Sequence, residues 1–176
     1  ARFPLSAGEA VYVQEGLQIT ALSRLVGLLV AAAGMVSAAT VTRGFYDEFG
    51  PRRVRDTPIS EMVIGGAAAG AAMNGLRTVA EFMTINFAFL ALDAMVNHAA
   101  KVHYMFGGQM KAPVVFRAPG GGGRQLGATH SHTPDVIFAH FPGLKVVSPA
   151  TPYDAKGLLK AAIRDNGPVM FIEPVP

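Results

Sequence analysis

The sequence Asp56-Thr57-Pro58-Ile59-Ser60-Glu61 marks a passage from strand to helix, and a run of small residues, 62–75, follows it directly. Pro58 fits the first turn of a helix behind a Thr57 N-cap. Gly75 stands where a left-handed residue commonly follows a helix. We therefore expect a helix over residues 58–74, with Glu61 at the junction of strand and helix.

Glu61 is a candidate for acid–base catalysis, because a carboxylate at such a junction has few charged neighbours in the sequence. The alternative is a purely local role, since acidic residues in a first helical turn often only stabilise the helix dipole. The following segment, Gly66-Ala67-Ala68-Ala69-Gly70, carries almost no side-chain bulk. We expect another element to pack very closely there, either in the core or from a partner.

Strand-like and helix-like segments alternate along the rest of the chain. We expect a surface helix or turn at 44–49, an extended piece at 53–55, a strand at 78–82, a long, largely buried helix at 87–105, and strands of interior type at 113–117, 144–147 and 169–172. Between the last two strands, Thr151, Pro152 and Asp154 form a capping box with proline at the first helical position, and Gly167-Pro168 ends that helix. This alternation predicts a doubly wound α/β fold, a parallel sheet covered on both faces.

Ligands bind beyond the carboxyl ends of the strands in such sheets, so Glu61 and the loops after Phe82 and Arg117 should lie together. The loop after Arg117 contains Gly120-Gly121-Gly122-Gly123. It could bring backbone N–H groups close to an anion, or it could be a flexible surface loop. It matches neither a P-loop nor a dinucleotide fingerprint.

Two histidines follow in Thr129-His130-Ser131-His132. Their spacing allows a metal site, but a proton carrier in an active-site loop fits better, because only Asp135 lies nearby as a carboxylate ligand. A serine hydrolase is disfavoured because no Gly-x-Ser-x-Gly motif is present.

The composition limits the partners of the chain. Charged residues make up only 15% of it, against about 25% in an average domain, and 51% of the residues are apolar, so we expect other protein to cover much of the surface. The net charge is +3 and the basic residues are scattered, which argues against nucleic acid. No cysteine is present. The apolar stretch 25–41 is favoured as a buried strand and helix, with a membrane span as the alternative. We expect no membrane partner.

Seven motifs recur together and in order in one family. They are Val41-Thr42-Arg43-Gly44, the segment 53–62 ending Asp-Thr-Pro-Ile-Ser-Glu-Met, Gly70-Ala71-Ala72-Met73, Glu81-Phe82-Met83-Thr84, Gly127-Ala128-Thr129-His130-Ser131, Pro142-Gly143-Leu144-Lys145-Val146-Val147 and Asp154-Ala155-Lys156-Gly157-Leu158. With them the chain resembles the beta subunit of the decarboxylating component of pyruvate and branched-chain 2-oxo acid dehydrogenase complexes. The resemblance covers residues 41–173, nearly the whole amino-terminal, pyrimidine-binding domain of that subunit.

The resemblance implies a thiamine diphosphate site shared between an alpha-type and a beta subunit. Glu61 would hydrogen-bond the aminopyrimidine ring and promote the tautomer that activates the thiazolium carbon. Phe87 and Ile59 would form an apolar wall against this ring. His130 would assist proton transfer and the transfer of the acyl group to a lipoyl group. Glu61 and His130 are thus the expected catalytic residues.

The family also implies metal ions and partners. Potassium would be bound by backbone carbonyls around Val114, Ala162, Asp165 and Gly167. The chain lacks the Gly-Asp-Gly motif that holds magnesium and the diphosphate, so the alpha-type subunit would supply them. Further partners would be a second beta subunit, in a beta–beta dimer within a heterotetramer, and the lipoyl-bearing acyltransferase. The gly-rich helix 66–70 would be a subunit-contact helix.

The chain departs from the family pattern at three places. Residues 29–39 contain no acid, where the family usually carries Gly-Glu-Glu or Gly-Glu-Asp. Leu90 stands where a polar residue is common. The family's carboxy-terminal domain is not part of the 176 residues. We expect a divergent segment at 1–40, belonging to the same domain, and the pyrimidine-binding domain at 41–176.

Alternatives remain open at this point. A non-catalytic interaction domain that keeps the fold and the partner surface is the main one, and a transketolase-like or sugar-phosphate synthase domain is another. Pyruvate, branched-chain 2-oxo acids and acetoin all remain candidate substrates. Without an arginine- and serine-rich presequence, the bacterial cytoplasm is favoured over the mitochondrial matrix.

Overall fold

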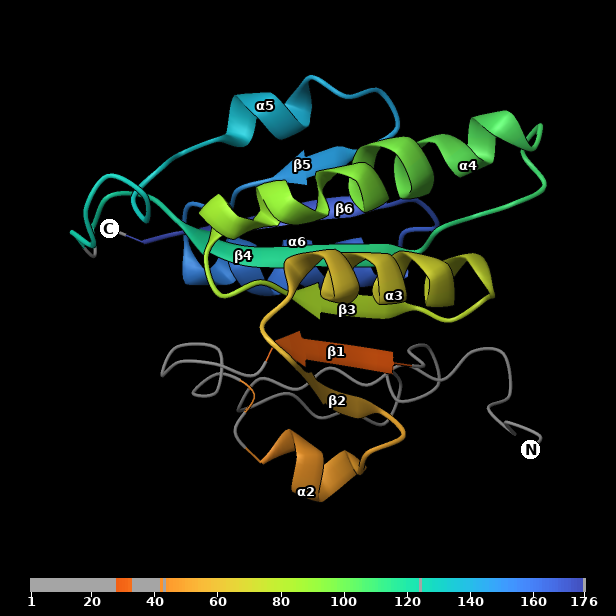
Figure 1. Cartoon of the computed structure of the whole chain (residues 1–176), viewed down its shortest axis with the longest axis horizontal. Coiled ribbons are helices and arrows are strands. Elements are labelled where there is room, and N and C mark those ends of the chain that lie inside the picture. Colours follow the sequence, from red (N-terminus) through yellow and green to blue (C-terminus); the bar gives the residue numbers. More distant parts are fainter. Residues whose placement is uncertain (1–27, 33–41, 43, 124, 176) are drawn as a thin grey trace.

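One parallel sheet carries the fold (Figure 1). The structure is a computed structural model and describes residues 28–32, 42, 44–123 and 125–175. Within these residues six strands pair in the order β2-β1-β3-β4-β6-β5, and all five pairings are parallel. The strands are β1 (Leu28–Ala32), β2 (Val54–Thr57), β3 (Thr78–Glu81), β4 (Val114–Gly120), β5 (Lys145–Val147) and β6 (Val169–Pro174).

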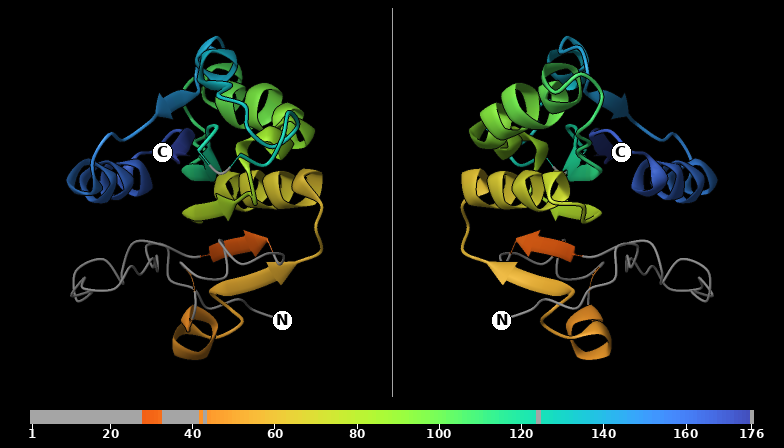
Figure 2. Two further views of the ribbon diagram at one scale, coloured as in Figure 1. Left: turned by 90° about the vertical axis from the view of Figure 1, so that its left-hand side faces the viewer. Right: turned by 90° about the vertical axis from the view of Figure 1, so that its right-hand side faces the viewer.

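Helices cover both faces of the sheet (Figure 2). One layer consists of α3 (Glu61–Met73), the 3₁₀ helix η1 (Ile85–Ala91), the π-helix η2 (Ala94–Ala99), α4 (Ala100–Met105) and α5 (Asp135–Ala139). The other face is covered by α6 (Pro152–Arg164) and by the short α2 (Phe45–Phe49). The predicted doubly wound α/β fold is therefore confirmed.

Strand alternation divides the core into two clusters. Along β4, Val114, Phe116 and Ala118 face the layer of α3 and η1, whereas Val115 packs in the cluster of α6. Phe116 stacks on Phe82 with ring centroids 6.2 Å apart and planes 4° from parallel. These interior strands have the continuous apolar sequence that burial on both faces requires.

The start of α3 differs from the sequence prediction. The helix begins at Glu61 with Ser60 as N-cap, rather than at Pro58 behind Thr57. Ser60 has extended backbone angles, φ −152° and ψ 98°, as is usual for an N-cap residue. Gly75 ends the segment with φ +95°, as predicted. Glu61 is consequently the first residue of the helix.

Two further elements depart from expectation. The helix expected at 87–105 begins at Ile85 and passes from 3₁₀ to π to α geometry, whose different hydrogen-bonding ladders the apolar pattern does not distinguish. The β5 strand is an edge strand of the described sheet, with Lys145 exposed, rather than an interior one. The apolar part of β5 is only Val146-Val147, and the strand pairs with β6 alone. By contrast, the capping box of α6 is confirmed, since the Asp154 N–H donates to Thr151 Oγ1 at 3.1 Å.

The expectations for residues 1–41 can be followed only over β1. The remainder of the stretch 25–41, including most of its acid-free part, lies outside the described residues. Among the residues that are described, no helix is long and apolar enough to cross a bilayer.

A close backbone contact at Gly143 gives the first prediction. Gly143 has φ +95°, and a Cβ atom there would lie 2.1 Å from the carbonyl oxygen of Ala100. We expect Gly143→Ala to lower the free energy of unfolding by about 2–4 kcal/mol, because it combines left-handed strain with overpacking. Denaturant unfolding measures the change.

The matched control is Gly157→Ala in α6, where an added Cβ meets no atom within 4 Å. It should leave stability unchanged or raise it by about 0.4–1 kcal/mol. Equal unfolding midpoints for the two variants would contradict the contact between Gly143 and Ala100.

Candidate active site

A pocket of about 400 Å³ lies beyond the carboxyl ends of the strands. Its walls come from the segments that follow β2, β3 and β4, from η1, and from the residue after β6. The lining residues are Ile59, Glu61, Met83, Thr84, Phe87, Leu90, Pro119, Gly120, Gly121, Leu126, His130 and Val175. The pocket thus contains all four of the residues predicted for the cofactor and for catalysis: Glu61, Ile59, Phe87 and His130.

Glu61 supplies a buried carboxylate to this pocket. Its exposed fraction is 5%, and it occupies the first position of α3, where the helix dipole favours a negative charge. No described residue hydrogen-bonds its side chain. Buried carboxylates normally have hydrogen-bonding partners, so this one is available to a donor that enters the pocket.

The contact between α3 and η1 determines where the pocket wall lies. A Cβ atom on Gly65 would lie 2.7 Å from Cβ of Ala91, so only glycine allows η1 to approach α3 this closely. The same side of α3 buries Ile64, Ala68 and Ala69. The expected close contact is thus made by Gly65, whereas Gly66 and Gly70 would have no atom within 4 Å of an added Cβ. For these two glycines, the prediction of close packing within the chain is wrong.

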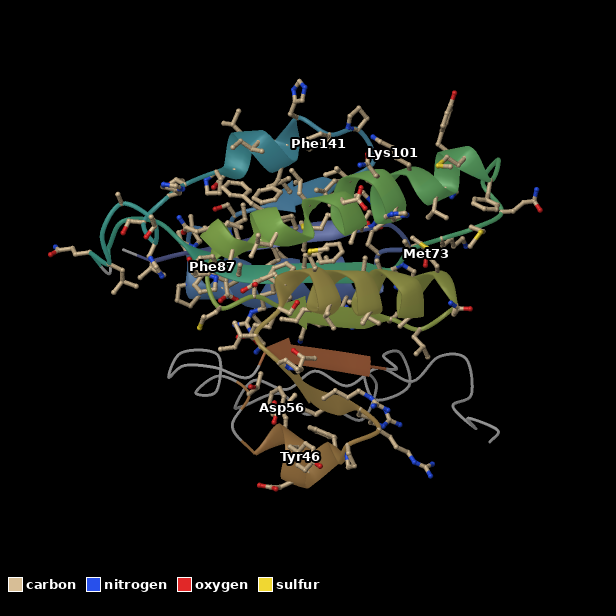
Figure 3. The ribbon with its side chains drawn as sticks, viewed as in Figure 1. Tyr46, Asp56, Met73, Phe87, Lys101 and Phe141 are labelled. Atoms are coloured by element: carbon tan, nitrogen blue, oxygen red, sulfur yellow. The ribbon has the colours of Figure 1, made fainter. Side chains whose placement is uncertain are left out.

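Phe87 and His130 meet inside the pocket, although they lie on different segments. Their rings are 5.0 Å apart and perpendicular, at 88°. Thr129 Oγ1 lies 2.8 Å from His130 Nδ1, which leaves Nε2 as the nitrogen without a described partner. Figure 3 shows Phe87 at the end of the helical layer that points to the carboxyl ends of the strands.

The glycine-rich loop is partly a continuation of β4. The strand extends to Gly120, where a Cβ atom would lie 3.0 Å from Cγ2 of Ile85. The Gly121 N–H donates to the carbonyl of His132 at 3.1 Å, and the Val175 N–H donates to the carbonyl of Gly120 at 2.8 Å. A side chain at Gly120 would therefore need Ile85 to shift by a few tenths of an ångström.

The idea of a metal site at the histidine pair gains no support. His132 is exposed and is not among the lining residues, unlike His130. No group of three or more metal-binding side chains of His, Cys, Asp or Glu occurs in the described part of the chain.

The four carbonyl positions expected for potassium lie around the end of α6. Ala162 is in its last turn, Asp165 follows it, Gly167 precedes β6, and Val114 begins β4. The guanidinium of Arg77 already donates to the Asp165 carbonyl at 2.6 Å and to that of Ile163 at 2.9 Å. A carbonyl oxygen has two lone pairs, so Asp165 retains one for a cation.

A buried network of charged residues, which sequence reasoning missed, joins three neighbouring strands. Arg117 on β4 donates from Nε and Nη2 to Glu173 on β6, at 2.5 and 3.0 Å, and from Nη1 to Glu81 on β3, at 3.0 Å. Burial raises the pKa of the Glu81 carboxyl, against the opposing effect of the Arg117 charge. A signal was present, because a charged residue interrupts the apolar run of each strand at the same end.

Other lining residues were not predicted individually. Met83, Thr84 and Val175 follow strand ends, and Leu126 lies in the loop before the histidines. Leu90, noted only as a departure from the family, is half exposed at the pocket. Met83 and Thr84 belong to the loop after Phe82, which the rule that ligands bind beyond strand ends already places at the site. The same rule, applied to β6, would have identified Val175.

A family model described as the transketolase pyrimidine binding domain matches residues 14–176. The chain belongs to this family. Over 136 residues, 77% of the chain, it is 57% identical to the pyruvate dehydrogenase E1 component subunit beta of Rhizobium meliloti and 52% identical to the human mitochondrial one. It spans only 30% and 38% of the length of these relatives. The resemblance inferred from the motifs is confirmed.

Solved structures agree on the fold. A split-gene transketolase described as an inactive beta4 tetramer superposes with a TM-score of 0.64 at 25% identity, covering 84% of this chain and 46% of the other. Transketolase from Leishmania mexicana gives 0.66 at 21% identity, covering 82% and 22%. At the latter identity the likeness shows the fold alone.

The raised pKa of Glu81 predicts a pH dependence of stability. The folded chain holds this proton to higher pH than the unfolded chain, whose carboxyl titrates near 4.5. The contribution of Glu81 is therefore fully present below pH 4.5 and is lost as the pH rises through the raised folded pKa. As the pH rises from 4.5 through the raised pKa of folded Glu81, the free energy of unfolding of the wild-type chain should fall relative to that of Glu81→Gln, which cannot titrate. Denaturant unfolding at several pH values measures the difference, and a gain with rising pH would contradict the assignment.

Proposed function

We propose that this chain supplies the pyrimidine half of a thiamine diphosphate site in the decarboxylating component of a pyruvate dehydrogenase-like 2-oxo acid dehydrogenase. One observation carries the proposal. The buried carboxylate of Glu61, which has no described partner, shares a pocket with Phe87, Ile59 and His130.

The pocket suits a flat, polar-edged ring. Its walls are mostly apolar, and its polar side chains are Glu61, Thr84 and His130. An aminopyrimidine offers N–H groups and ring nitrogens at its edge, which a carboxylate can bind, and faces that pack on apolar side chains. When bound, thiamine diphosphate supplies the stabilised carbanion that 2-oxo acid decarboxylation needs.

The residues of this chain would take distinct parts in the reaction. Glu61 would hydrogen-bond a nitrogen of the aminopyrimidine ring and would hold the proton that the ring's tautomers exchange. Phe87 and Ile59 position the ring and exclude water from the carboxylate. His130, with Nδ1 next to Thr129, presents Nε2 for proton transfer during decarboxylation and acyl transfer to lipoyl.

A partner is required to complete the site. No lysine or arginine is among the described lining residues, so this chain offers no cation to the diphosphate. An alpha-type subunit would supply magnesium and the diphosphate site. Ile59, Leu90 and Leu126 are each more than half exposed at the pocket, as expected where a second chain completes the wall.

The remaining assignments complete the proposal. The exposed Met62, Val63 and Gly66 on the outer side of α3 offer the surface for subunit contacts, in a heterotetramer with a beta–beta dimer. The lipoyl-bearing acyltransferase is the proposed acyl acceptor. Potassium at the carbonyls of Val114, Ala162, Asp165 and Gly167 would stabilise the end of α6. The proposed compartment is the bacterial cytoplasm, and the substrate is pyruvate or another 2-oxo acid.

A non-catalytic interaction domain is the second candidate. Its support is the absence of any acid at 29–39 and the apolar Leu90 at the pocket. The first measurement is therefore a calorimetric titration of thiamine diphosphate and magnesium into the chain mixed with an alpha-type partner. Saturable binding that needs both chains favours catalysis, and association of the chains without cofactor binding favours the interaction domain.

A substitution at Glu61 tests the catalytic role. In the reconstituted alpha–beta complex, Glu61→Gln should lower kcat by about 10²-fold or more, because an amide cannot hold the transferred proton. Assembly, measured by size-exclusion chromatography, should remain intact. Glu48→Gln on the exposed face of α2 is the matched control and should keep full activity. Retained decarboxylation in the Glu61 variant would overturn the role.

A further inference from the structure

The network of Glu81, Arg117 and Glu173 joins three strands whose ends contribute half of the residues that line the pocket. Glu81 is the last residue of β3 and lies directly opposite Arg117 on β4. Glu173 lies on β6, opposite Pro119, two residues closer to the pocket than Arg117. One guanidinium thus binds carboxylates on both neighbouring strands, close to their carboxyl ends.

Each of these strands continues directly into a pocket wall. Met83 and Thr84 follow Glu81, Gly120 and Gly121 follow Arg117, and Val175 follows Glu173. The side chains of the network lie on the α6 side of the sheet, because Arg117 alternates with the inward-facing Phe116. The network therefore connects the strands that lead into the pocket walls, and none of its three residues lines the pocket.

Stability alone explains this network poorly. The side chains of Arg117 and Glu81 are only 5% and 4% exposed, and removing such groups from water costs several kcal/mol per ion. An apolar trio of similar volume would avoid that cost. The guanidinium fixes the relative orientation of the strands, because its rigid, planar group donates two N–H groups to Glu173 and a third to Glu81.

We propose that Arg117, with Glu81 and Glu173, is a positioning residue that fixes the three pocket walls relative to one another and thereby sets cofactor affinity. The part concerning affinity rests on the proposed function. The part concerning the walls does not, because the pocket and the network are both present in this chain alone.

Amide hydrogen exchange, followed residue by residue in the chain bound to its alpha-type partner, separates positioning from general stability. The amides of Phe82 and Val175 report on the pocket ends, since they donate to the carbonyls of Arg117 and Gly120 at 2.8 Å. The Thr78 amide donates to Pro113 at 3.1 Å and reports on the opposite end of the same strands.

In Arg117→Lys and Glu173→Gln, exchange at Phe82 and Val175 should accelerate about tenfold or more, with little change at Thr78, as for local opening. Equal acceleration at both ends, or none, would overturn the proposal. Should Arg117→Lys not fold, Glu173→Gln carries the test alone, because its carboxylate is 30% exposed and its loss perturbs the core least.

The second readout is cofactor binding. In both variants the concentration of thiamine diphosphate for half-saturation should rise about tenfold, while kcat at saturation changes less than about threefold, the pattern of lost positioning rather than lost chemistry. Lys101→Met is the matched control, because it removes a charged donor to the Pro142 carbonyl and should leave half-saturation unchanged. Figure 3 shows Lys101 in the same helical layer, well away from Phe87.

Unchanged half-saturation in the variants would overturn the effect on affinity. Absence of cofactor binding by the wild-type complex would overturn the proposed function instead. The exchange measurement keeps its meaning in that case, since it needs no cofactor.

Discussion

Parallel pairing of the strands is the constraint on which the site depends. Because the described strands all pair in parallel, the carboxyl ends of β2, β3, β4 and β6 meet at one edge of the sheet. Residues as distant in sequence as Glu61, His130 and Val175 therefore line one pocket. The strand order adds a second condition, because the crossover from β2 to β3 carries α3 over β1 and places the first residue of that helix at the pocket.

Close packing and unpaired charge act together at this edge. Gly65 and Ala91 allow η1 to lie against α3, and Phe87 and Leu90 of η1 line the same pocket as Glu61 of α3. Glu61 is buried, with an exposed fraction of 5%, and no described residue hydrogen-bonds its side chain. A fold tolerates such a group when a ligand or partner completes it, so the cost of burial is itself a sign of function. The Glu81–Arg117–Glu173 network shows the opposite case, a buried charge set that the chain satisfies from its own strands.

Much of this arrangement follows from the sequence, and the remainder fails for identifiable reasons. Apolar runs and caps predicted the strands and α6, because burial and capping leave a local pattern. The start of α3 was misplaced by three residues, because Thr57 and Ser60 are both good N-cap residues and Pro58 fits either a first helical turn or the segment before a helix. The sequence did not show that β5 lies at the edge of the sheet, since two consecutive valines, Val146 and Val147, occur in edge strands as well as in interior strands. The site residues came from motif resemblance, whereas the ion network required knowledge of register, which fixes Glu81 opposite Arg117.

The pocket's chemistry argues that it is one half of a larger site. Its described lining offers a carboxylate and an imidazole but no cationic side chain, and a diphosphate needs positive charge at close range. Its mouth exposes Ile59, Leu90 and Leu126 by more than half, which is unfavourable in water unless another apolar surface covers them. The same pocket thus lacks a cationic side chain and has exposed apolar residues in its wall. A single partner that presents a metal-bound diphosphate and an apolar rim would supply both the charge and the cover. In the proposed two-chain site, the side of Glu61 would then handle proton transfer, and the partner would neutralise the phosphate charge.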